Sequence, residues 1–100
     1  MVRGVAGEGE FTRALAALLR DIRVECGMSQ EALAAELGLD QAAVSRVESG
    51  HRRLGVRDLL IWAEALGREP RELAIRAADL WSGLAARPGT LWIGDEDELG

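Results

Sequence analysis

The segment that decides the fold is SQEALAAELGLDQAAVSRVESG, residues 29–50. Ser29 stands before an apolar helical face and is a favourable N-cap residue, and Gly38 marks the end of a first short helix. Asp40 is again a favourable N-cap, and the helix that it opens ends near Gly50. The segment therefore predicts two short helices joined by a tight turn that contains Gly38.

Helical spacing continues on both sides of these two helices, and no alternating strand pattern of any length occurs. A helix is expected over residues 10–26, because Gly27 stands where a C-terminal glycine would end it. Two more are expected over residues 56–66 and 70–86, the latter opened by Pro70, which the first turn of a helix tolerates. We therefore expect an all-α fold of five helices.

The chain divides accordingly into three parts. Glycine-rich residues 1–9 are expected to form a flexible leader, residues 10–79 the helical domain, and residues 80–100 a C-terminal extension. No internal repeat or second domain is evident. The chain has a single cysteine, no signal-peptide pattern and no apolar run of the ~20 residues that a membrane span needs, so we expect a cytoplasmic protein without membrane contact.

The formal net charge of −5 argues at first against a polyanionic partner. The charge is unevenly distributed, however. Residues 41–57 hold four arginines against the single acid Glu48, whereas residues 95–98 are four consecutive acids. A basic segment at the second short helix is compatible with binding to nucleic acid.

Catalysis and metal binding are disfavoured by the residues present. One histidine and one cysteine cannot build a zinc site of ordinary composition. Ser45, His51 and Asp58 could be imagined as a triad, but nothing orients the imidazole and no oxyanion-hole motif is present. We therefore expect no enzyme activity, no metal ion and no cofactor.

The two short helices resemble the helix-turn-helix of the lambda-repressor and Cro-like family, also called Xre-type regulators. In this arrangement the second helix enters the major groove of DNA. The resemblance spans residues 15–75 and rests on the motifs LRDIR (19–23), MSQEALA (28–34), LGL (37–39), VSRVESG (44–50) and LG (66–67). It implies a compact five-helix domain that binds double-stranded DNA and regulates transcription, most simply as a repressor.

The resemblance also implies three groups of DNA contacts. The start of the first short helix favours a phosphate, the exposed face of the second reads base edges, and the following loop meets the sugar–phosphate backbone. For the base edges, Gln suits adenine and Arg suits guanine. These groups are Gln30; then Gln41, Ala42, Ser45 and Arg46; and then His51, Arg52 and Arg53.

Other residues receive structural interpretations. Arg23 and Glu48 match a family pair that links the first helix to the end of the recognition helix, so both are assigned to the fold. Trp62 is expected in the core, and Cys26 is expected to be a small packing residue. His51 can equally be a loop residue without a role.

The distal half of the fifth helix carries a second hypothesis. It is expected to extend beyond the compact domain and to expose apolar side chains, which marks an interface. A homodimer would also address two half-sites about 34 Å apart. The residues expected at the dimer interface are Leu80, Trp81, Leu84, Leu91, Trp92 and Ile93.

Three alternatives remain open at this point. Within the regulator class, the sequence does not separate a phage-type repressor, a restriction–modification controller and a stand-alone repressor. From another class, an antitoxin would bind a toxin through residues 80–99 and repress its own operon. Finally, a domain of this family could have lost DNA binding and serve only as a scaffold.

Overall fold

The computed structural model describes residues 5–84, with side chains from residue 9 onward, and in this range it contains five helices and no strand. The predicted all-α fold is confirmed. The helices are α1 (Val5–Glu25), α2 (Gln30–Leu37), α3 (Gln41–Glu48), α4 (Val56–Ala65) and α5 (Pro70–Ser82).

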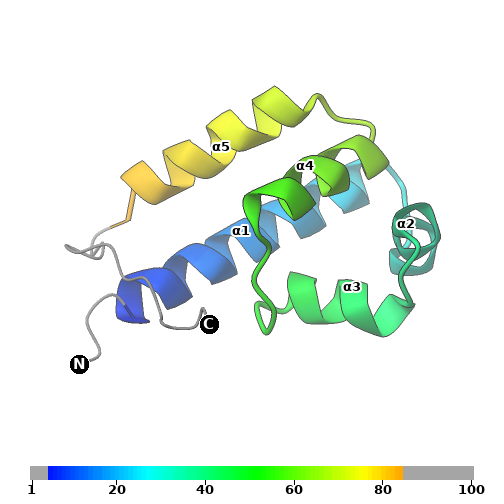
Figure 1. Ribbon diagram of the computed structural model, residues 1–100, viewed down its shortest axis with the longest axis horizontal. Coiled ribbons are helices and arrows are strands. Elements are labelled where there is room, and N and C mark those ends of the chain that lie inside the picture. Colours follow the sequence, from blue (N-terminus) through cyan, green and yellow to red (C-terminus); the bar gives the residue numbers. More distant parts are fainter. Residues whose placement is uncertain (1–4, 85–100) are drawn as a thin grey trace.

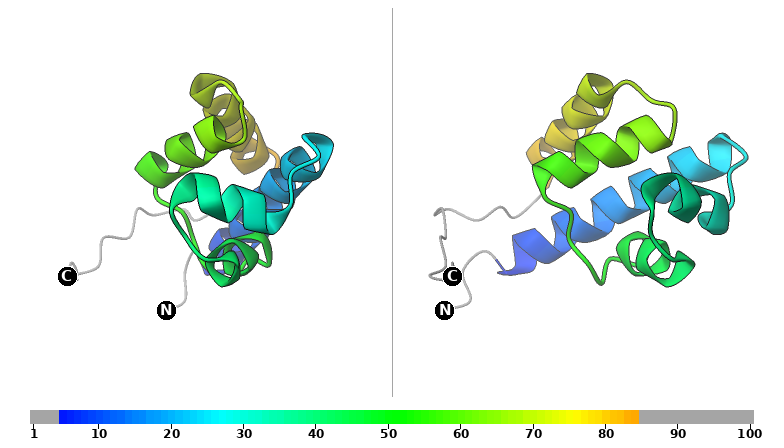
Figure 2. Two further views of the ribbon diagram at one scale, coloured as in Figure 1. Left: turned by 90° about the vertical axis from the view of Figure 1, so that its right-hand side faces the viewer. Right: turned by 45° about the vertical axis from the view of Figure 1, so that its right-hand side comes forward.

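Helix α1, the longest of the five, runs through the middle of the domain (Figure 1). On one side of it lie α4 and α5, which pack on each other; α3 lies on the other side, and α2 lies near the C-terminal end of α1 (Figures 1 and 2). The end of α5 lies beside the start of α1. There the rings of Phe11 and Trp81 meet edge to face with their centroids 5.6 Å apart.

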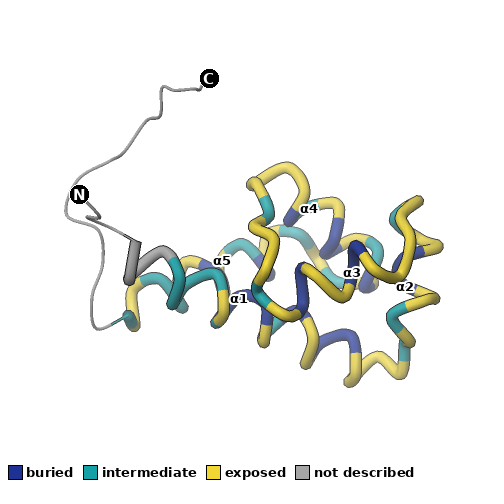
Figure 3. Tube along the Cα trace, turned by 90° about the horizontal axis from the view of Figure 1, so that it is seen from below, coloured by how far each residue is buried: buried dark blue, intermediate teal, exposed yellow. Residues whose placement is uncertain are grey.

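The core forms where the helices meet, and the buried positions follow their inward faces (Figure 3). Trp62 is 2% exposed, as predicted for a core residue. Its indole N–H has no hydrogen-bond partner among the described residues. The largest fully buried side chains are Leu19, Ile22, Leu33, Val44 and Leu73.

The caps of α2 and α3 are as predicted. Ser29 Oγ accepts a hydrogen bond of 3.0 Å from the Ala32 N–H, and Asp40 Oδ1 accepts one of 2.9 Å from the Ala43 N–H. Gly38 ends α2 with φ 70°, in the left-handed region that favours glycine. A Cβ at this position would meet no atom within 4 Å, so the backbone angle, and not a close helix crossing, requires glycine there.

Two helix ends differ from the prediction. Helix α1 begins at Val5, so residues 5–9, expected in a flexible leader, belong to the helix. Interior glycines such as Gly7 cost only about 1 kcal/mol each, which does not stop a helix that packing supports. Helix α5 ends at Ser82 rather than at residue 86, because Gly83 follows and apolar spacing alone does not mark a helix end.

The predicted pair of Arg23 and Glu48 is a buried, two-pronged ion pair. Arg23 Nε lies 2.7 Å from Glu48 Oε2, and Arg23 Nη2 lies 3.0 Å from Oε1. The remaining Nη1 donates to the Met28 carbonyl at 2.7 Å. The two side chains are only 10% and 3% exposed. The pair thus fixes α1 to the end of α3 and to the turn before α2.

Replacing Glu48 by alanine would leave the Arg23 guanidinium buried without its counter-charge. We expect Glu48→Ala to lower the free energy of unfolding by about 3–5 kcal/mol, measured by urea denaturation. The control is Arg23→Met combined with Glu48→Leu, which removes both charges and keeps the volume; it should be far closer to the unmodified protein. A loss below 1 kcal/mol for Glu48→Ala would contradict this role.

Candidate DNA interface

Helix α3 has one buried and one exposed face (Figure 3). Ala43, Val44, Val47 and Glu48 are buried, so the remaining positions of the eight-residue helix face outward. The outward positions are those that the resemblance assigned to the DNA groove: Gln41, Ala42, Ser45 and Arg46, all exposed. A short helix with a firmly packed inner face therefore presents one strip of polar and small side chains.

Two glutamines connect this strip to the buried ion pair. Gln30 Nε2 donates to Glu48 Oε1 at 2.9 Å, and Gln41 Nε2 donates to Gln30 Oε1 at 3.1 Å. Because a carboxylate only accepts, Glu48 fixes which end of the Gln30 amide faces inward. This leaves Oε1 and one amide hydrogen of Gln41 directed to other partners. Sequence reasoning placed Gln30 at a phosphate and did not foresee its link to Glu48 and Gln41.

The loop after α3 carries the predicted basic residues. His51, Arg52 and Arg53 are all exposed. His51 Nδ1 lies 2.7 Å from Ser49 Oγ, which itself donates to the Arg46 carbonyl at 3.1 Å. His51 is therefore held against the C-terminal end of α3.

One basic residue of this region was missed. A Cβ placed on Gly50 would lie 3.3 Å from Cγ of Arg13, so the exposed Arg13 of α1 passes directly over the end of α3. Gly50 has φ 81°, a second reason for glycine at this position. Nothing in the sequence marks Arg13, because it lies far from the motif and only the packing of α1 on α3 brings it near. Arg13 thus lies beside the end of α3, from which the loop with Arg52 and Arg53 continues.

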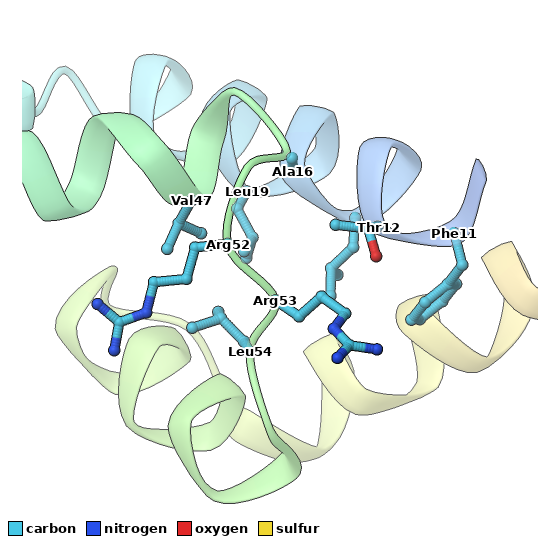
Figure 4. A pocket seen from close by; sticks show the side chains of 9 residues that line it. Phe11, Thr12, Ala16, Leu19, Val47, Arg52, Arg53 and Leu54 are labelled. Atoms are coloured by element: carbon cyan, nitrogen blue, oxygen red, sulfur yellow. The ribbon is translucent and has the colours of Figure 1, made fainter. Parts of the chain in front are cut away.

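A pocket of about 130 Å³ lies between the first half of α1 and the loop that follows α3 (Figure 4). Most of the side chains that line it are apolar, and two arginines flank it. Arg52 extends past Val47 and Leu54 at one end, whereas Arg53 extends toward Phe11 at the other. The residues that line it are Phe11, Thr12, Leu15, Ala16, Leu19, Val47, Arg52, Arg53 and Leu54.

The predicted dimer residues are less accessible than expected. Leu80 packs against the core, and Trp81 contacts Phe11 of the same chain. Leu80, Trp81 and Leu84 are all only partly exposed. The expectation of an exposed distal half of α5 is therefore wrong, because the start of α1 reaches far enough to cover it. Leu91, Trp92 and Ile93 lie outside the described residues. The exposed large apolar side chains of the last two helices are instead Val56, Ile61 and Ile75.

Other kinds of site find little support in the described part of the chain. Residues 5–84 contain no helix long and apolar enough to cross a membrane. Over the same range no three histidine, cysteine or acidic side chains are grouped as a metal site would require. Cys26, predicted as a packing residue, is exposed, and its thiol lies 3.4 Å from the Leu66 carbonyl.

Comparison with known proteins agrees with this geometry. The family model described as helix-turn-helix matches residues 19–73. The restriction-modification controller protein C.AhdI from Aeromonas hydrophila shares 42% sequence identity over 62% of this chain and 90% of its own, with a TM-score of 0.57. An XRE-family like protein from Pseudomonas syringae pv. tomato str. DC3000 shares 33% identity over 70% of this chain and 85% of its own, with a TM-score of 0.64.

The clp gene regulator ClgR from C. glutamicum is similar over 76% of this chain and 96% of its own, at 26% identity and a TM-score of 0.63. No curated protein matches the chain at a significant level. The matched residues 19–73 include both short helices and the exposed strip of α3. The chain belongs to the Xre-type helix-turn-helix family of DNA-binding transcriptional regulators.

Proposed function

We propose that this protein binds an operator as a homodimer, with α3 in the major groove, and acts as a repressor in the cytoplasm. The observation that carries the proposal is the exposed strip of α3, with Arg13 of α1 against the end of the helix and the exposed Arg52 and Arg53 in the loop that follows. An α-helix fits the width of the major groove, and flanking cations then meet the phosphates on its rim.

Base recognition falls to Gln41 and Arg46. Gln41 holds one amide hydrogen toward Gln30 and keeps an acceptor and a donor, the two groups that adenine requires. Arg46 is exposed on the same face and has the fork geometry that suits guanine. Ala42 and Ser45 are small, so they allow close approach and add a methyl and a hydroxyl contact.

Phosphate contacts fall to the surrounding residues. Gln30 lies at the first turn of α2, where backbone N–H groups already favour an anion. Arg13, Arg52 and Arg53 supply positive charge beside α3, and His51 lies at its end. These contacts position the domain and contribute affinity that is independent of sequence.

For the dimer we propose the outer surface of α4 and α5, because Val56, Ile61 and Ile75 are exposed there by 76%, 39% and 54%. Two copies joined through this surface would present two recognition helices to half-sites one helical turn apart. The antitoxin alternative rests on residues 80–99, most of which lie outside the described residues.

Substitutions of Arg46 and Arg52 separate base reading from phosphate binding. Arg46→Ala should reduce the ratio of operator to non-operator affinity by roughly 10- to 100-fold for each of the two half-sites, the value of one two-pronged base contact in each. The matched control Arg52→Ala should weaken both affinities about equally. The operator is first identified by selection from random DNA, and affinities follow from fluorescence anisotropy. An unchanged ratio for Arg46→Ala would show that Arg46 does not contact bases.

Arg13 lies outside the helix-turn-helix motif, and its substitution tests the proposed phosphate contact. Each phosphate contact releases counterions, so the logarithm of the binding constant falls linearly with the logarithm of salt concentration. Arg13→Ala should reduce the steepness of this line by about 1.8, because a homodimer loses one phosphate contact of about 0.9 in each subunit. Arg76→Ala, an exposed arginine of α5, is the control and should not change the slope. Equal slopes for the unmodified protein, Arg13→Ala and Arg76→Ala would show that Arg13 does not contact DNA.

A charge placed on α5 tests the proposed dimer. Ile75→Asp puts a charge into the proposed interface, so sedimentation should report a monomer and operator affinity should fall. Val24→Asp is matched in exposure, 55% against 54%, but lies on α1 and should leave the dimer intact. A dimer that survives Ile75→Asp would show that the interface lies elsewhere.

A further inference from the structure

The pocket between α1 and the loop after α3 has a feature that DNA binding does not explain. Its floor consists of apolar side chains, among them the buried Leu15, Leu19 and Val47. Phosphates account for the arginines at its edge, but a phosphate backbone offers no apolar group to fill such a floor. A volume of about 130 Å³ suits one aliphatic side chain. The pocket therefore fits an apolar group followed by negative charge.

One segment of this chain has that composition. Residues 91–93 are Leu-Trp-Ile, and after a single glycine residues 95–98 are Asp-Glu-Asp-Glu. These four acids make up most of the net charge of −5. Facing them would be Arg52 and Arg53 at the pocket and Arg13 over the end of α3. The apolar residues 91–93 thus match the apolar lining of the pocket, and the acidic residues 95–98 match the arginines beside it.

The described chain stops beside this pocket. The Leu84 N–H bonds the Trp81 carbonyl at 3.2 Å, so Leu84 lies within one turn of Trp81. The Trp81 ring contacts Phe11, which lines the pocket. Six residues separate Leu84 from Leu91, and the seven Cα–Cα steps between the two can span up to ~23 Å when extended. The wall of α1 from Phe11 to Leu19 is only ~12 Å long, so the segment reaches all of it.

We propose that residues 91–98 bind in this pocket of their own chain, with Leu91 or Ile93 in the cavity and the acids beside Arg13, Arg52 and Arg53. Because these arginines are also the proposed phosphate contacts, the segment and DNA exclude each other. Non-specific DNA then competes poorly, whereas an operator that adds base contacts displaces the segment. The competition rests on the proposed function; the intramolecular contact does not.

The first experiment removes the apolar anchor and keeps every charge. In the full-length Leu91→Ser, Ile93→Ser variant, affinity for a non-operator duplex should rise on the order of tenfold, the value for a site that is 90% occupied by the segment. Simple repulsion between the acids and DNA predicts no change, because the net charge is the same. An unchanged affinity would therefore overturn the competition.

The second experiment neutralises the acids. Asp95→Asn, Glu96→Gln, Asp97→Asn and Glu98→Gln together should raise non-operator affinity at least as much as the anchor variant. The matched control removes the same four negative charges from exposed sites elsewhere, where no contact to the pocket is proposed. An equal effect of the control would show a general charge effect and contradict docking. The control positions are Asp21, Glu36, Glu64 and Asp79.

The third experiment needs no DNA and keeps the contact separate from the proposed function. The backbone NMR signals of Thr12 and Leu54, which line the pocket, should shift between the unmodified protein and the anchor variant. Shifts that do not depend on protein concentration support an intramolecular contact. Absence of shifts overturns the proposal even if DNA binding is normal, and shifts that vanish on dilution assign the occupant to a second copy instead.

Discussion

The buried ion pair between Arg23 and Glu48 is the constraint on which the rest of the structure depends. Charges this far from water are tolerated only when their partners are complete, and here every guanidinium nitrogen donates, two to the carboxylate and one to the Met28 carbonyl. The three acceptors belong to the end of α3 and the turn before α2. A shift of either helix along α1 would break this geometry, so the pair fixes the placement of both.

The same carboxylate also reaches the surface. Glu48 accepts from Gln30, and Gln30 accepts from Gln41, so the direction of both amides follows from a group inside the core. Helices of eight residues are too short to be stable in isolation, and α2 and α3 depend on their caps and on packing. In the proposed complex, α3 is already held at its inner face, at its N-cap and through Gln41. It therefore loses little further freedom on binding DNA, which favours discrimination between bases.

The sequence was sufficient for those features that local chemistry controls. Ser29 and Asp40 cap α2 and α3 as predicted, and the period of α3 separates the exposed strip from buried Val44 and Val47. What it could not provide depends on distant segments meeting. Arg13 approaches Gly50 only through the packing of α1, and Trp81 is covered only because Phe11 lies opposite. The start of α1 at Val5 was also missed, because the glycines near the N-terminus were expected to prevent a helix there. Packing of α1 against the rest of the domain offsets their cost.

The net charge of −5 does not predict which ligands this protein binds, because binding depends on where the charges lie and not on their sum. Exposed charges more than a Debye length apart, about 8 Å at physiological salt, hardly act on one another. The arginines beside α3 therefore interact with what lies next to them, whatever the total charge of the chain. A basic surface of this kind binds any polyanion, and sequence preference then depends on contacts that only the correct site adds. The apolar pocket beside those arginines adds a second basis for selecting a ligand. It favours an acidic ligand that also carries an aliphatic group over a ligand that is only charged.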